Sequence, residues 1–168
     1  ELGPQTDLAS DVASLICEMT GTERVAFANT GSEAVMTAVR IARTVTQRRK
    51  VVLFKGAFHG NSDIVLGVSI GGKTVPSSPG IMSGTVEDLI VLEYGKMETL
   101  DTIREIGDDL AAVLVEPVQS RNPELQPKEF LHKLRALTKE MEAALIFDEI
   151  ITGFRICQGG AQAHFGVR

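Results

Sequence analysis

The stretch A-A-L-I-F-D-E-I-I-T-G-F-R at 143–155 decides the fold that the sequence predicts. Its apolar run at 144–147 is typical of a short strand buried on both faces of a parallel sheet. Two carboxylates, Asp148 and Glu149, follow this run directly. In open α/β sheets, ligands bind at the carboxyl ends of the strands. Because a carboxylate at the edge of an apolar core needs a partner to stay charged, we expect Asp148 to be paired.

Strands and helices alternate through most of the remaining chain. Short apolar runs predict further strands at 25–28, 51–54, 89–92 and 111–115. Apolar residues at helical spacing predict helices at 7–19, 33–46, 97–107 and 128–142. The inward face predicted for the second helix consists of Val35, Ala38, Val39, Ala42 and Val45. Thr30 and Glu33 fit a capping box at its start.

Two segments interrupt this pattern. The run at 64–68 suits either a short helix or a strand, and Gly, Pro and Ser make 71–84 a predicted long surface loop. The alternation elsewhere predicts an α/β fold, with a mostly parallel central sheet between layers of helices.

Composition excludes several classes of protein. The 168 residues, 43% hydrophobic and 23% charged, are ordinary for a globular domain with its own core. A net charge of −5 argues against a nucleic-acid-binding surface, and no apolar run reaches transmembrane length. Cys17 and Cys157 are too few for a disulfide framework, which indicates a reduced, cytoplasmic protein. Because the chain opens without an initiator methionine, we expect a piece of a longer polypeptide.

The turn N-T-G-S-E-A at 29–34 has two interpretations. It leads from a predicted strand into a helix, and free N–H groups at a helix start, with the Ser32 hydroxyl, suit a phosphate. Plain helix capping by Thr30 or Ser32 explains the same residues and is commoner. The turn matches neither G-x-G-x-x-G nor a P-loop, so it predicts no dinucleotide or nucleoside triphosphate.

The turn G-A-F-H-G at 56–60 follows the strand at 51–54. Phe58 is able to lie flat against a planar ligand, with His59 at its rim. Alternatively, Phe58 belongs to the core and His59 is solvated.

Carboxylates also follow the strand at 111–115. Glu116 and Pro117 end that strand, as Asp148 and Glu149 end the one at 144–147. For Glu116 and Glu149, capping or a salt bridge with Arg155 is an alternative to a functional role.

Taken together, the three strand ends predict a phosphorylated aromatic cofactor, and pyridoxal phosphate fits. Its phosphate would take the helix start, its ring would stack on Phe58, and its ring nitrogen would pair with Asp148. A carboxylate keeps that nitrogen protonated, so that the ring withdraws electrons from a substrate carbanion. No metal site is predicted.

The ordered motifs N-T-G-S-E-A, G-A-F-H-G, V-E-P-V and F-D-E-I-I-T-G-F-R resemble the class III aminotransferases, including glutamate-1-semialdehyde aminomutase. The resemblance covers the whole chain and implies a fold type I, pyridoxal phosphate-dependent enzyme. It implies that Gly31 and Ser32 hold the phosphate. Phe58 and Ile150 would lie on opposite ring faces, and Asp148 would pair with the ring nitrogen. It places Glu116 and His59 near the cofactor in supporting roles.

The family's Schiff-base lysine lies beyond the aspartate motif, and this chain has no Lys after Lys139. Residues 1–168 are therefore expected to be part of the cofactor-binding large domain, truncated at both ends and without its catalytic amine. After V-E-P-V the aminomutases carry a Gly-Asn element, whereas this chain reads Q-S-R-N-P at 119–123.

The runs V-E-P-V-Q-S-R, Q-P-K-E-F-L and G-G-A-Q-A-H-F-G are most similar to aminotransferase domains of polyketide/nonribosomal peptide synthases of the microcystin and nodularin type. That resemblance implies transamination of a β-keto acyl chain on a carrier protein, with glutamate as donor, in a homodimer. An aminomutase, another pyridoxal phosphate reaction such as decarboxylation, and a non-catalytic scaffold domain remain alternatives.

Overall fold

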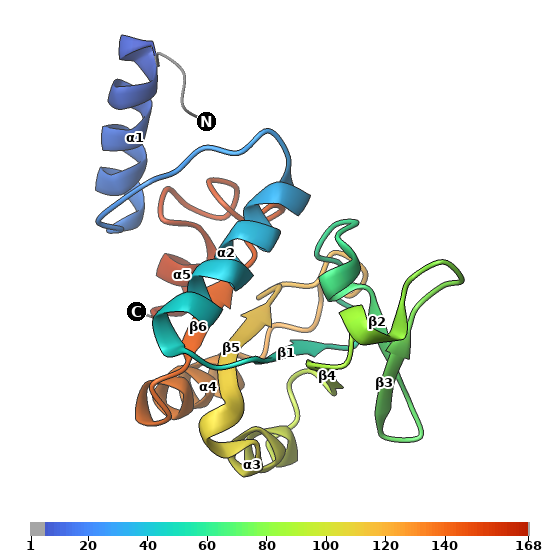
Figure 1. Cartoon of the computed structure of the whole chain (residues 1–168). Coiled ribbons are helices and arrows are strands. Elements are labelled where there is room, and N and C mark those ends of the chain that lie inside the picture. Colours follow the sequence, from blue (N-terminus) through green and yellow to red (C-terminus); the bar gives the residue numbers. More distant parts are fainter. Residues whose placement is uncertain (1–5, 168) are drawn as a thin grey trace.

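A four-stranded parallel sheet forms the centre of the molecule (Figure 1). The computed structural model describes residues 6–167. The strands are β1 (Lys50–Phe54), β4 (Leu89–Leu92), β5 (Leu110–Val115) and β6 (Ala144–Phe147), in the spatial order β4-β1-β5-β6. All three pairings are parallel, which confirms the predicted α/β fold and four of its five predicted strands.

Helices cover both faces of the sheet. The covering helices are α2 (Gly31–Thr46), α3 (Glu98–Glu105), α4 (Lys128–Glu140) and α5 (Gly160–Phe165), whereas α1 (Asp7–Thr20) has no buried residue and stands apart from the sheet (Figure 1). Figure 1 shows α2 on one face and α3 and α4 on the other. Three short 3-10 turns, η1 (Asp63–Val65), η2 (Ser83–Thr85) and η3 (Gly107–Asp109), lie in the connections.

Alternate residues of each central strand enter two separate cores. Val52 and Val113 pack in the core that contains α3 and α4, whereas Val51 and Ala112 pack in the core that contains α2. This is the period of two that a strand imposes on its side chains. Because both faces are covered, all six residues of β5 are buried, and the strand reads as a continuous apolar run.

The predicted strand at 25–28 is wrong. Among the described residues no strand pairs with this segment, and Phe27 is 54% exposed. In Figure 1 the segment is part of the long connection from α1 to α2. Four apolar residues suit an extended connection as well as a strand, and only a hydrogen-bonding neighbour separates the two.

The predicted surface loop at 71–84 begins with a hairpin instead. Strands β2 (Gly67–Ile70) and β3 (Lys73–Pro76) pair antiparallel across Gly71 and Gly72, which both have positive φ. Such a two-residue turn needs positive φ at both positions, so two glycines suit it. The undecided run at 64–68 divides between η1 and the start of β2.

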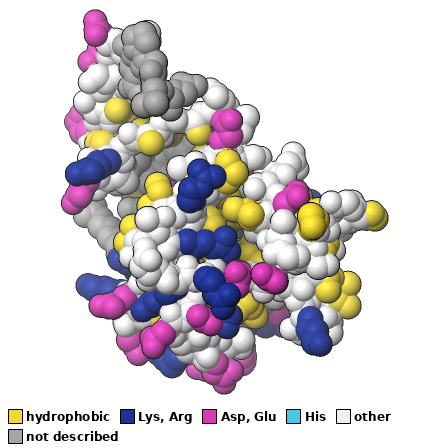
Figure 2. Space-filling model, viewed as in Figure 1, with side chains coloured by type: hydrophobic (Ala, Val, Ile, Leu, Met, Phe, Trp, Pro, Cys, Tyr) yellow, Lys and Arg dark blue, Asp and Glu magenta, His cyan; other side chains and the backbone are white. Residues whose placement is uncertain are grey.

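Some apolar helix residues remain outside the core. Val45, predicted to face inward on α2, is instead 77% exposed, one residue before the helix ends at Thr46. On α1, Leu8, Val12 and Leu15 are exposed although their spacing is helical. Figure 2 shows hydrophobic side chains scattered among charged ones on one face. In the part of the chain that the structure describes, no helix is both long and apolar enough to span a membrane.

Candidate active site

The segments that follow β1, β5 and β6 meet the turn before α2 at one end of the sheet. Since these strands are parallel neighbours, their carboxyl ends lie at the same edge. A cavity of about 310 Å³ opens there. Its walls include all of the residues for which the sequence predicts a cofactor contact: Gly31, Ser32, Phe58, His59, Glu116, Asp148 and Ile150. Sequence reasoning missed the wall residues Val35, Gly60, Asn61, Ser120 and Ile151.

Asp148 is buried at the end of β6. Its backbone N–H donates to the Val115 carbonyl at 2.8 Å, which continues the pairing of β6 with β5 by one residue. Its Oδ2 lies 2.7 Å from Nδ1 of His59, and its Oδ1 accepts from the Ile150 N–H at 3.2 Å. Among the described residues, the side-chain partner of this carboxylate is therefore an imidazole from the turn after β1.

His59 is only 4% exposed, so the alternative of a solvated turn histidine is wrong. Because the Asp148 carboxylate accepts, Nδ1 carries the hydrogen of this pair. Nε2 is buried and has no hydrogen-bond partner among the described residues. A buried polar atom left without a partner costs about 1–3 kcal/mol, so a ligand atom or a water that bonds to Nε2 would be stabilised there.

The start of α2 combines capping with an open anion site. Thr30 accepts from the Glu33 N–H at 3.2 Å, and the Glu33 carboxylate accepts from the Thr30 N–H at 3.1 Å, which confirms the capping box. Ser32 takes no part in this capping. Among the described residues, the N–H groups of Gly31 and Ser32 donate to no protein acceptor. The first turn of this 16-residue helix therefore presents free donors at its positive end.

The turn after β1 lies against this helix start. The Asn61 N–H donates to the Ser32 Oγ at 3.0 Å, which leaves the Ser32 hydroxyl hydrogen for another acceptor. Gly60 has a φ of 86°, and a Cβ at this position would overlap the Ser32 hydroxyl. Gly60, the last glycine of G-A-F-H-G, is thus favoured for two reasons: other residues rarely adopt its positive φ, and a Cβ would not fit between the two segments.

Two apolar side chains at the cavity are exposed. Phe58 is 49% exposed, so the alternative of a core phenylalanine is wrong. Ile150 is also exposed, and its Cδ1 lies 2.9 Å from the position that a Cβ on Gly31 would take. Exposed apolar groups beside a cavity provide contact surface for a flat, apolar ligand.

Glu116 is buried between two loops. Its Oε2 accepts from the Phe58 N–H at 3.2 Å, and its Oε1 accepts from the Ser120 N–H at 2.8 Å. Both carboxylate oxygens are thus used by backbone donors, one from the turn after β1 and one from the loop after β5.

Glu149 caps α5 and does not line this cavity. Its Oε1 accepts from the Gln162 N–H at 2.9 Å, and its Oε2 accepts from the Ala161 N–H at 2.5 Å and from the Thr152 hydroxyl at 2.8 Å. The capping alternative for Glu149 is confirmed, with α5 as the capped helix.

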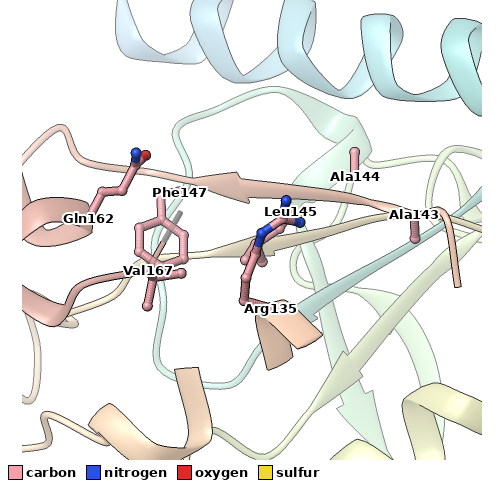
Figure 3. Close-up of a pocket in the computed structure, with 7 residues that line it drawn as sticks. All are labelled: Arg135, Ala143, Ala144, Leu145, Phe147, Gln162 and Val167. Carbon is pink, nitrogen blue, oxygen red and sulfur yellow. The ribbon is translucent and has the colours of Figure 1, made fainter. Parts of the chain in front are cut away.

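A second cavity, of about 440 Å³, follows the outer edge of β6 (Figure 3). Its walls are Arg135, Ala143, Ala144, Leu145, Phe147, Gln162 and Val167. It contains none of the residues with predicted chemistry, and Arg135 and Gln162 are its only strongly polar side chains. Within residues 6–167, no group of three or more His, Cys, Asp or Glu side chains is arranged to bind a metal ion.

The first cavity fits a flat, phosphorylated ring with a basic nitrogen. The open start of α2 suits a phosphate, the Asp148 carboxylate suits a protonated ring nitrogen, and Phe58 and Ile150 suit the ring faces. The buried Nε2 of His59 adds a hydrogen-bonding atom that has no partner among the described residues.

Comparisons with known proteins agree with this chemistry. The chain is 44% identical to a glutamate-1-semialdehyde 2,1-aminomutase of Clostridium novyi (strain NT), over 98% of the chain and 40% of that protein. Its structure resembles an omega-transaminase from Sphaerobacter thermophilus, with a TM-score of 0.90 and 31% identity over 99% of this chain and 40% of the other. It also resembles a transaminase with PLP bound, with a TM-score of 0.90 and 33% identity over 99% of this chain and 40% of that one.

The chain thus spans about 40% of the length of these relatives. A model of the class III aminotransferases matches residues 3–168. Members of this family depend on pyridoxal phosphate. On the sequence match and the arrangement of strand ends around one cavity, the chain belongs to the class III aminotransferase family.

Proposed function

We propose that the full-length protein is a pyridoxal phosphate-dependent aminotransferase that binds its cofactor in the cavity at the ends of β1, β5 and β6. One observation carries the proposal. The open start of α2, the exposed Phe58 ring and the buried Asp148 carboxylate all line the same cavity. Family membership supports the choice of cofactor.

The start of α2 would hold the phosphate. The N–H groups of Gly31 and Ser32 and the Ser32 hydroxyl hydrogen are its donors, and the helix dipole favours the negative charge. Asn61 orients the Ser32 hydroxyl, because its N–H occupies one lone pair of Oγ.

Asp148 would hold a proton on the ring nitrogen. Bound pyridoxal phosphate supplies an electron sink for a carbanion formed at the substrate carbon. A negative carboxylate favours the protonated form of that nitrogen, because opposite charges at short range stabilise each other. The His59 Nδ1–H, 2.7 Å from Oδ2, orients the carboxylate and leaves lone pairs for the ligand.

The covalent anchor is expected elsewhere in the protein. In this proposal a lysine downstream of residue 168 supplies the Schiff-base amine and the base that moves the substrate proton. The described residues then supply the non-covalent part of the site.

For the substrate we propose a β-keto acyl chain on a carrier protein, with glutamate as amino donor, in a polyketide/nonribosomal peptide synthase. The segment Q-S-R-N-P at 119–123 and its neighbouring motifs support this choice. Ser120 from this segment lines the cavity, where the substrate would be bound beside the cofactor. A homodimer in the cytoplasm completes the proposal.

The test uses the full-length protein loaded with pyridoxal phosphate. With glutamate and a β-keto acyl carrier protein, we expect 2-oxoglutarate and the β-amino acyl product in equal amounts, measured by coupled assay and mass spectrometry. Cofactor binding without any glutamate-dependent 2-oxoglutarate would contradict transamination from this donor.

An aminomutase is the second candidate, because the sequence identity of 44% is to a glutamate-1-semialdehyde 2,1-aminomutase. Incubation with glutamate 1-semialdehyde separates the two, since an aminomutase isomerises it and releases no donor-derived keto acid. A protein that binds no cofactor would instead fit the scaffold alternative.

A further inference from the structure

Glu116 connects two loops at the cavity through its carboxylate. Its side chain is buried, and each oxygen accepts one backbone N–H, from Phe58 on one side and from Ser120 on the other. We propose that Glu116 is a positioning residue, which fixes the Phe58 ring for the bound cofactor rather than binding the cofactor itself. This inference rests on the proposed function.

A second residue ties the same loops together. Gln119 donates from Nε2 to the Lys55 carbonyl at 2.9 Å. Its amide lies against Gly56, where a Cβ would come within 2.8 Å of the Gln119 Oε1. The turn after β1 is thus held at Lys55 by a donor and at Phe58 by an acceptor, both from the loop after β5. Two bonds three residues apart restrict the rotation of the turn as well as its position.

The loop after β5 is in turn anchored to the core. The Tyr94 hydroxyl donates to the Pro117 carbonyl at 2.8 Å. Burial, and to a smaller extent the charge of Glu116, raise the pKa of Tyr94 above its ordinary value, so the hydroxyl remains a donor. The Tyr94 ring packs with Phe54 and Phe130 at centroid distances of 5.2 and 5.6 Å. The backbone that Glu116 holds is therefore connected to the centre of the core.

The Phe58 ring lies at the surface of the cavity, so the position of its backbone matters for where the ring lies. The side chain is half exposed, and among the described residues its ring forms no contact with another aromatic ring. The place from which the ring extends is set by the backbone at Phe58, whose N–H donates to Glu116. A ring fixed in advance contributes more to binding, since less rotational freedom is lost.

The test is a double-mutant cycle in the full-length protein, with pyridoxal phosphate affinity as the readout. Glu116→Met removes both acceptors at similar length, and Phe58→Leu removes the flat ring. Because Phe58→Leu removes the stacking of an aromatic ring, we expect it to lower affinity by about 3- to 10-fold. If Glu116 acts through Phe58, Glu116→Met costs no more than Phe58→Leu, and the double variant is no weaker than Phe58→Leu alone. Glu116→Gln, which retains one acceptor, recovers part of the loss.

Additive losses would overturn the inference, because a residue that contacts the cofactor directly, or one that only stabilises the fold, lowers affinity independently of the ring. Glu124→Met, at an exposed position of the same loop, is the matched control and leaves affinity unchanged. Absence of cofactor binding by the unchanged protein would overturn the proposed function as well. Binding with additive losses would overturn this inference alone.

If the Glu116 variants do not fold, the inference is tested by a measurement on the unchanged protein. In hydrogen exchange without added cofactor, the Phe58 amide is expected to exchange slowly although it lies in a turn, because a buried carboxylate accepts it. Exchange as fast as at the exposed glycines Gly71 and Gly72 would overturn the inference.

Discussion

Asp148 and Glu149 are neighbours in the sequence, but their carboxylates belong to two different regions of the molecule. Asp148 lines the cavity and contacts His59, a residue 89 positions away, whereas Glu149 accepts from the first N–H groups of α5. Both side chains accept hydrogen bonds, so being paired does not distinguish a functional carboxylate from a structural one. The identity of the partner distinguishes them. Asp148 contacts an imidazole whose second nitrogen has no partner among the described residues, whereas Glu149 contacts the backbone of a helix.

The largest effect is expected from Asp148→Asn. Loss of the charge opposite a protonated ring nitrogen should lower kcat by about 100- to 1,000-fold, a range typical for removal of one electrostatic stabiliser in an active site. The melting temperature should also fall, because asparagine retains an acceptor for the Ile150 N–H but turns an amide N–H toward the buried Nδ1–H of His59. Steady-state turnover and thermal unfolding measure the two effects. Asp108→Asn, at an exposed position, is the control, and unchanged turnover in Asp148→Asn would remove Asp148 from its proposed role.

Gly60→Ala tests the close approach between the turn after β1 and α2. The added Cβ would overlap the Ser32 hydroxyl and would also require a positive φ. We expect a loss of about 1–3 kcal/mol in stability from the backbone strain, together with weaker cofactor binding. Denaturant unfolding and cofactor titration provide the readouts. Gly84→Ala, with ordinary φ and open space around it, should change neither. Tolerance of alanine at both positions would mean that the two segments do not need to touch.

Glu149→Gln should distinguish the structural role of Glu149 from the binding role proposed for Asp148. Its oxygens accept three hydrogen bonds, and the amide cannot accept them all, so we expect a loss of about 1–3 kcal/mol in the free energy of unfolding. Cofactor affinity should remain close to that of the unchanged protein. Chemical denaturation and cofactor titration test this, with exposed Glu105→Gln for comparison. A loss of affinity without a loss of stability would reverse the roles assigned to Asp148 and Glu149.

The smallest effects separate capping from phosphate binding at the start of α2. Thr30→Ala removes the cap and should cost about 1 kcal/mol of stability with little change in cofactor affinity. Ser32→Ala should weaken cofactor binding and cost less stability than Thr30→Ala, because Ser32 is not part of the capping box and accepts only the exposed Asn61 N–H. Chemical denaturation and cofactor titration measure the two effects for both variants. Equal effects on stability would show that Ser32 supports the helix in the same way as Thr30.

The strands of the central sheet and the cap of α2 could be predicted because each depends on a few consecutive residues. A fully buried strand such as β5 reads as an apolar run, and the capping box at Thr30 and Glu33 lies within four residues. The predicted strand at 25–28 failed because a strand also needs a neighbour, which lies outside any short window. The hairpin across Gly71 and Gly72 was missed although two adjacent glycines between short apolar runs are a known hairpin signal.

The site could be predicted as a set of residues but not as a set of contacts. The predicted residues line the cavity because parallel neighbours bring their carboxyl termini together, but Val35, Gly60, Asn61, Ser120 and Ile151, which also line it, were missed. The pairing of His59 with Asp148 joins residues 89 positions apart, and the bond from the Phe58 N–H to Glu116 joins residues 58 positions apart. Such contacts depend on loop conformation, which composition and periodicity do not determine.

The most direct test of the account is an experimental structure of the full-length protein with pyridoxal phosphate. We expect the phosphate to accept from the N–H groups of Gly31 and Ser32, and the ring nitrogen to lie within hydrogen-bonding distance of the Asp148 carboxylate. A cofactor bound elsewhere, for example in the cavity beside Arg135 and Phe147, or one whose ring nitrogen faces away from Asp148, would contradict the central claim.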